Sequence, residues 1–90
     1  MARLTRAAIF EDINAERARQ AERWSAPHRW GRGDCSSSEV DETVKASVLA
    51  EECGEVSRAV LDADHEALRR ELIQVAAVAV AWLETYEWQS

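Results

Sequence analysis

Three stretches of the chain place apolar residues at the spacing of amphipathic helices. Residues 4–24 contain no proline or glycine and carry a weak apolar stripe between charged positions. Residues 38–61 and 64–86 carry stronger stripes at the same ~100° period. Residues 25–37, between the first two stretches, contain the one proline, two glycines and a run of serines, and they predict a loop. The pattern therefore predicts three helices and one substantial loop.

Capping residues indicate where these helices begin. Ser38 is followed by three acidic residues within four positions, which favours a helix start near Ser38. Asp62 and Asp64 are both candidate caps for the third helix. Because so few residues separate the second and third helices, we expect them to form an antiparallel hairpin.

The composition agrees with a packed helical protein. The chain has 90 residues, of which 47% are hydrophobic, with one proline and three glycines. We therefore expect a single all-α domain over residues 1–90. A domain of this size buries little surface, so we expect the N-terminal helix and the hairpin to assemble into a multi-helix bundle as a homo-oligomer.

Charge and sequence signals exclude several classes of protein. The net charge of -6 would repel a phosphate backbone, so we expect no binding of duplex nucleic acid. The longest apolar run, Val75 to Leu83, is nine residues, well short of the ~20 that span a bilayer. Cys35 and Cys53 have no metal or disulfide spacing, and the start of the sequence shows no signal peptide. These observations predict a cytoplasmic protein that does not bind membranes.

Glutamates interrupt the apolar faces of the predicted hairpin. At ~100° per residue, Glu52 and Glu55 fall inside the apolar arc of the second helix, and Glu51 lies at its edge. Glu71 falls between apolar residues of the third helix. With Ala63 as the middle of the turn, Glu55 and Glu71 are each eight residues away. Acidic side chains are therefore expected to meet between the two helices.

A second facing pair lies one turn further from the connection. Glu52 and Gln74 are each eleven residues from Ala63. The two pairs should lie about 12 Å and 16 Å from the turn at a rise of ~1.5 Å per residue. Carboxylates in such a place must be protonated, paired with a cation or bound to a metal, because isolated buried charges are too costly.

Two interpretations of the glutamates stay open at this point. Clustered oxygen ligands without histidine or thiolate favour a hard ion, Mg²⁺ or Mn²⁺, held in a carboxylate cage. Alternatively, the acids lie at a wet groove and form ordinary ion pairs with Lys45, Arg58 or Arg70.

The acidic residues resemble a known family motif. The stretches "LAEECGEV" and "RRELIQVAAVAVAWLE" are similar to the MazG-like all-α nucleoside triphosphate pyrophosphohydrolases, whose signature is E-E-x-x-E on one helix and E-x-x-D on the next. Glu51, Glu52 and Glu55 match the first half, and Glu71 begins the second. Gln74 stands where the family has aspartate. The resemblance covers about residues 41 to 85.

The resemblance implies a metal-dependent hydrolase that converts nucleoside triphosphates to monophosphates and pyrophosphate. Glu51, Glu52, Glu55, Glu71 and Gln74 would hold Mg²⁺ or Mn²⁺, and Glu52 or Glu55 would accept a proton from the attacking water. The family forms dimers or tetramers. The change at Gln74 removes one negative charge, and the alternative is a noncatalytic nucleotide- or protein-binding module on the same scaffold.

Three further residues are candidates for substrate binding. Lys45 lies two turns before Glu52 and can meet a phosphate, although a solvated lysine is the alternative. Arg58 lies one turn from Glu55, where it contacts substrate or forms a simple ion pair. Trp30, in the predicted loop, is positioned to stack on a base.

Overall fold

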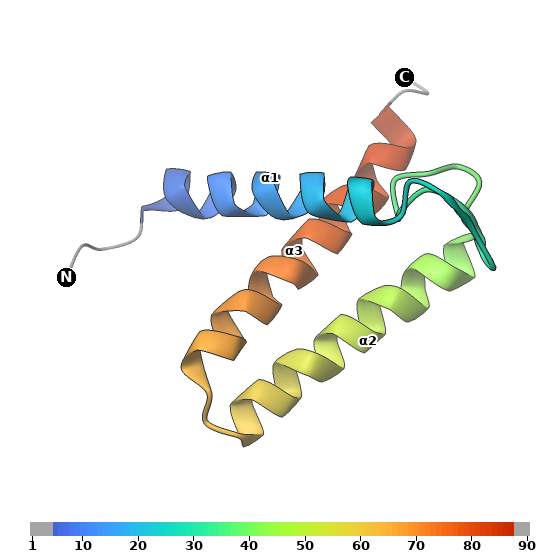
Figure 1. The fold of residues 1–90 in the computed structure, drawn as a ribbon. Coiled ribbons are helices and arrows are strands. Elements are labelled where there is room, and N and C mark those ends of the chain that lie inside the picture. The colour runs from blue at the N-terminus through green and yellow to red at the C-terminus, as the bar shows by residue number, and fades with distance from the viewer. Residues whose placement is uncertain (1–4, 88–90) are drawn as a thin grey trace.

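The computed structural model describes residues 5–87 and is mainly helical, as predicted (Figure 1). Residue 4, where the first helix was predicted to begin, lies outside this range. The elements in chain order are α1 (Arg6–Arg23), β1 (Pro27–His28), β2 (Gly31–Arg32), α2 (Glu42–Leu61) and α3 (His65–Glu87). Within residues 5–87, no helix is long and apolar enough to cross a bilayer.

The predicted loop contains a small antiparallel hairpin that sequence reasoning did not anticipate. Pro27 pairs with Arg32, and His28 pairs with Gly31. Gly31 has a positive φ of 131°, and a β-carbon there would collide with the carbonyl oxygen of Glu39. The hairpin therefore depends on glycine for its tight packing against the segment that leads into α2.

The second helix begins later than predicted. Ser38 lies in an exposed turn, and α2 begins at Glu42 with Asp41 as its N-cap. The Asp41 side chain accepts a hydrogen bond from the backbone N–H of Glu42 at 3.1 Å. Residues before it stay in turns because the Val40 N–H donates to the Ser37 carbonyl and the Val40 side chain is buried. The acidic residues near Ser38 thus mark the helix region correctly but not its first residue.

A tight turn joins α2 and α3 into the predicted antiparallel hairpin. The N–H of Asp64 donates to the Ala59 carbonyl, and the N–H of Ala63 donates to the Val60 carbonyl, which is a Schellman motif. Asp62 is the C-cap of α2. Asp64 caps α3, because its side chain accepts from the Ala67 N–H at 3.0 Å. Of the two predicted caps for α3, Asp64 is therefore the one used.

Replacing Ala63 by glycine is expected to stabilise the fold. Ala63 has φ of 53°, a left-handed conformation that strains any residue with a β-carbon. We expect Ala63→Gly to raise the free energy of unfolding by about 0.5–1 kcal/mol, measured by urea denaturation. The matched control is Ala50→Gly, at an exposed position inside α2. It should lower the free energy of unfolding by about 0.5–1 kcal/mol, and equal effects of both variants would contradict the prediction.

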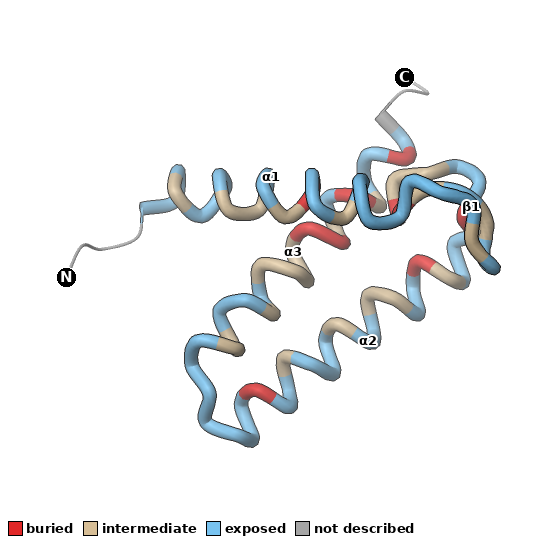
Figure 2. Tube along the Cα trace, in the orientation of Figure 1, coloured by how far each residue is buried: buried red, intermediate tan, exposed pale blue. Residues whose placement is uncertain are grey.

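Helix α3 is the centre of the packing. Both α1 and α2 pack on α3, but within residues 5–87 they do not pack on each other. Ala77 and Ala81 are fully buried and lie one turn apart on one face of α3, and Ala81 packs in one cluster with Cys35 and Val78. Figure 2 shows buried positions on α3 near the place where α1 crosses it, and others toward both ends of α2. The separation of α1 and α2 leaves a groove above α3.

Candidate functional site

The groove between α1 and α2 has a volume of about 600 Å³. Helix α1 forms one wall, α2 forms the other, and the loop closes one end. Its polar and aromatic lining includes Arg19 and Arg23 from α1, Trp24 and Trp30 from the loop, and Glu51 and Glu52 from α2. Gln74 and Val78 of α3 line the floor. The α1 wall thus carries two arginines together with Glu16, the α2 wall carries two glutamates, and the closed end is aromatic.

The structure brings together three of the predicted site residues. Glu52 and Glu71 lie within hydrogen-bonding reach of each other. With its amide nitrogen turned toward them, Gln74 donates to Glu52 Oε2 at 2.9 Å and to Glu71 Oε2 at 3.3 Å. The facing of Glu52 and Gln74 was predicted from their equal distance to the turn, and it is confirmed. Glu71 was predicted to face Glu55, and in the structure it meets Glu52.

The environment of Glu52 opposes its ionisation. Burial raises the pKa of the Glu52 carboxyl, and the neighbouring Glu71, Glu51 and Glu55 raise it further. Among residues 5–86, none of these four glutamates forms an ion pair with arginine or lysine. The ion pairs expected under the wet-groove interpretation are therefore absent from this part of the chain. The site therefore holds concentrated negative charge beside the Gln74 amide.

A complete carboxylate cage is not pre-formed. In the described part of the chain, no three histidine, cysteine, aspartate or glutamate side chains converge closely enough to hold a metal ion. Glu51 and Glu55 are exposed on α2. However, Mg²⁺ usually takes only one or two carboxylates from the protein and completes its shell with water and substrate phosphates. The pair of Glu52 and Glu71 offers the one or two carboxylates that such an ion takes.

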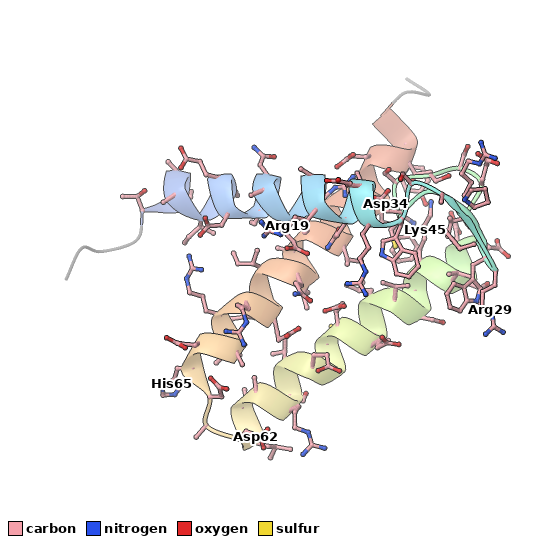
Figure 3. All side chains as sticks on the ribbon, viewed as in Figure 1. Arg19, Arg29, Asp34, Lys45, Asp62 and His65 are labelled. Atoms are coloured by element: carbon pink, nitrogen blue, oxygen red, sulfur yellow. The ribbon has the colours of Figure 1, made fainter. Side chains whose placement is uncertain are left out.

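The prediction that Lys45 contacts substrate is wrong. Lys45 is 1% exposed, and its Nζ donates to Thr85 Oγ1 at 2.8 Å. Thr85 Oγ1 in turn donates to the Cys35 carbonyl at 3.2 Å. The lysine faces the same side of α2 as Glu52, but there its side chain crosses to α3 instead of entering the groove. Figure 3 places Lys45 and Asp34 at the end of the molecule where the loop meets α2.

Of the two other predicted substrate contacts, Trp30 lines the groove and Arg58 does not. Arg58 is exposed, does not line the groove and, among residues 5–86, forms no ion pair with Glu55. The geometry gives it no contact with a ligand in the groove. Trp30 does line the groove and is 47% exposed, and the Arg29 guanidinium lies 5.0 Å from its ring centre. Trp30 is thus available to a planar ligand.

Sequence reasoning missed the network that holds the loop in place. Arg17 binds Glu84 of α3 with two hydrogen bonds, of 2.7 and 2.9 Å, and binds Asp34 of the loop at 2.7 Å. Asp34 also accepts from the N–H and hydroxyl of Ser36. Burial raises the pKa of Asp34, but the hydrogen bonds from Ser36 and Arg17 outweigh burial and lower it. One arginine therefore fastens α1, the loop and α3 together.

A signal for Arg17 is present in the sequence. At ~100° per residue, Arg17 falls within the apolar stripe of α1, between Ile13 and Ala21. A charged residue at such a position is either exposed by chance or buried with a partner. The groove arginines, Arg19 and Arg23, carry no comparable signal, because both look like ordinary surface residues of a charged helix.

The chain matches no protein-family model, and neither a curated protein nor a solved structure matches it. The resemblance to the MazG-like enzymes therefore rests on the motif glutamates and on their arrangement in the hairpin.

Proposed function

We propose that this protein is a Mg²⁺- or Mn²⁺-dependent nucleoside triphosphate pyrophosphohydrolase. The observation that carries the proposal is the pair of Glu52 and Glu71, whose negative charge has no cationic partner among residues 5–86 and lies beside a groove of about 600 Å³. A groove with an acidic wall for a divalent ion, arginines for phosphates and an exposed tryptophan for a base suits a nucleotide.

Different residues of the groove bind the base, the phosphates and the metal ion. Trp30 offers a face for the base, and Arg23 offers a guanidinium to the phosphates from the opposite wall. Glu52 and Glu71 would hold the metal ion, which supplies Lewis-acid polarisation of the phosphate chain. Glu52, or the more exposed Glu55, accepts the proton of the attacking water. Hydrolysis between the α- and β-phosphates consumes one water and yields a monophosphate and pyrophosphate.

Gln74 favours a second candidate, a noncatalytic nucleotide-binding module. Its amide donates to both Glu52 and Glu71, so the two carboxyl groups are partly satisfied without a metal. A neutral ligand at this position also weakens the attraction for a divalent ion. Such a module would keep affinity for nucleotides in the groove and lack turnover.

One experiment separates the two candidates. Pyrophosphate release is measured over a panel of canonical and modified nucleoside triphosphates with saturating Mg²⁺ or Mn²⁺, and nucleotide binding is measured in parallel by calorimetry. Metal-dependent release from any member supports the hydrolase. Binding without release, by a folded protein, supports the module, and neither binding nor release removes both candidates.

We also propose that the protein works as a homo-oligomer that buries the apolar face of α3. Leu68, Leu72, Val75, Ala79 and Leu83 fall within an arc of about 80° on this helix. Leu72 and Leu83 are 51% and 64% exposed. The stripe is about 22 Å long, which suits the roughly 800 Å² that each subunit of a stable dimer buries.

The small core of the subunit supports a second copy as the partner on this face. The largest fully buried side chain in the described residues is that of Lys45, and the buried apolar residues are cysteine, valine and alanine. A core this small gives a helical chain little stability on its own. A second copy is present wherever the chain is made, and the symmetric pairing of two α3 faces enlarges both cores at once.

A charged substitution on the α3 face is expected to separate the subunits. Light scattering should give the wild type at least twice the chain mass of 10.1 kDa. Leu72→Glu should shift the protein to the monomer mass, because the carboxylate cannot be buried against a second apolar face. Leu61→Glu, at the end of α2 and outside the stripe, is the matched control and should keep the wild-type mass. A monomeric wild type would contradict the proposal.

A further inference from the structure

A second hollow, of about 450 Å³, lies between α1 and α3. Three arginines line it, namely Arg19 from α1 and Arg69 and Arg70 from α3. Figure 3 labels Arg19 near the place where α1 and α3 cross in this view. Two acidic side chains, Asp12 and Glu16, line it as well, so its lining carries one net positive charge in a protein whose net charge is -6. The hollow therefore offers a local site for an anion.

The cations of this hollow are available to a ligand. Arg69 pairs with Asp12 at 2.6 Å, and Arg19 pairs with Glu16 at 2.8 Å, but both arginines remain well exposed. The Arg69–Asp12 pair is exposed on both sides, and such a pair contributes little and is exchanged easily for a stronger partner. The Glu16 side chain is only 15% exposed, so Arg19 stays paired with it and meets a ligand through its own exposed side. Arg70 is exposed and, among residues 5–86, has no acidic partner. The hollow thus carries one spare positive charge, at Arg70, and one that can be redirected, at Arg69.

The arginine hollow and the groove adjoin each other. Glu16, Arg19 and Gln74 line both of them. Gln74 also donates to Glu52 and Glu71, so the carboxylate pair lies at the junction of the two spaces. An elongated ligand can therefore pass from the aromatic end of the groove, over Gln74, to the three arginines.

We propose that the hollow lined by Arg19, Arg69 and Arg70 binds the terminal two phosphates of the substrate and holds the pyrophosphate product. This inference rests on the proposed function and fixes the direction in which the nucleotide lies. The base lies at Trp30, the terminal phosphates lie at Arg70, and the carboxylate pair lies beside the bond between them. Guanidinium groups suit this task because they donate two parallel hydrogen bonds to phosphate oxygens.

Product binding tests the two ends of the substrate separately. Calorimetry is used to titrate inorganic pyrophosphate, and separately a nucleoside monophosphate, into the full chain with Mg²⁺ present. Arg70→Gln should weaken pyrophosphate binding about tenfold, because a charged hydrogen bond is lost, and should leave monophosphate binding unchanged. Trp30→Ala should weaken monophosphate binding and leave pyrophosphate binding unchanged. Arg58→Gln, a helical arginine outside both spaces, is the matched control and should change neither affinity.

The outcomes distinguish this inference from the proposed function. Pyrophosphate binding that depends on Arg70 supports the arginine hollow even if no nucleotide is hydrolysed, in which case only the enzymatic proposal fails. Hydrolysis together with pyrophosphate binding that Arg70→Gln leaves unchanged overturns the inference while the enzyme stands. A wild-type chain that binds no pyrophosphate also overturns the inference. Circular dichroism of each variant confirms that the helices are intact.

Discussion

Glu52→Gln should reduce pyrophosphate release by a hundredfold or more, on the order expected when a metal-binding carboxylate is removed from a hydrolytic site. The substitution keeps the size of the side chain and its place beside Glu71 and Gln74. It removes the charge that attracts the divalent ion. It also removes the carboxylate that accepts the proton of the attacking water. The initial rate of pyrophosphate release under saturating Mg²⁺ measures the effect.

The same substitution should make the fold more stable at neutral pH. The pKa of Glu52 is raised by burial and by Glu71, so the folded state binds this proton more tightly than the unfolded chain. Its stabilising contribution is present below the ordinary glutamate pKa of about 4.3 and is lost as the pH rises through the raised value. Glutamine does not titrate. The variant should therefore melt at nearly the wild-type temperature near pH 4 and a few degrees higher at pH 7.

The control for this prediction is Glu22→Gln, an exposed carboxylate on α1 outside both spaces. It should change neither the rate nor the pH dependence of the melting temperature. Wild-type activity in Glu52→Gln would contradict the catalytic role of the carboxylate. An equal or lower melting temperature at pH 7 would show that Glu52 is not under electrostatic strain in the folded protein.

The hairpin part of the site was predictable because local geometry determines it. A turn of a few residues places residues at equal distances from Ala63 at the same height, whatever the rest of the fold does. The meeting of Glu52, Gln74 and Glu71 follows from that rule and from helical periodicity. The rule did not predict which side chain meets which within the cluster. A glutamate or glutamine side chain is long enough to reach the level one helical turn above or below its own.

The groove itself was not predictable, because it depends on where α1 crosses α3. The apolar stripe of α1 is weak, and nothing local indicates which part of α3 this helix packs on. The prediction that Lys45 contacts substrate fails for a related reason. A lysine is usually solvated, and its burial against Thr85 depends on a loop segment whose path is set by tertiary contacts. Long-range contacts therefore decide which polar residues line the site.

Arg17 holds that loop in place, and replacing it is expected to have the second large effect. Its side chain is only 10% exposed and meets the 5% exposed side chain of Asp34. In Arg17→Ala, the buried carboxylate of Asp34 loses its cation and keeps only the hydrogen bonds from Ser36. We expect a loss of about 3 kcal/mol in the free energy of unfolding, the usual size when one partner of a buried pair is removed. The melting temperature should fall by roughly 10–20 °C.

Arg19→Ala is the matched control, because Arg19 lies on the same helix and also pairs with an acid. The Arg19 side chain is 66% exposed, against 10% for Arg17, so the loss of its pair with Glu16 should cost only about 1 kcal/mol. Arg17→Lys should lower the free energy of unfolding by an amount between those of the two alanine variants. An ammonium keeps the charge but cannot bond Glu84 through two nitrogens. If Arg17→Ala and Arg19→Ala melted at the same temperature, the loop would not depend on Arg17. The hydrogen bond from Thr85 of α3 to the Cys35 carbonyl would then be the contact that holds the loop, and with it Trp30, at the groove.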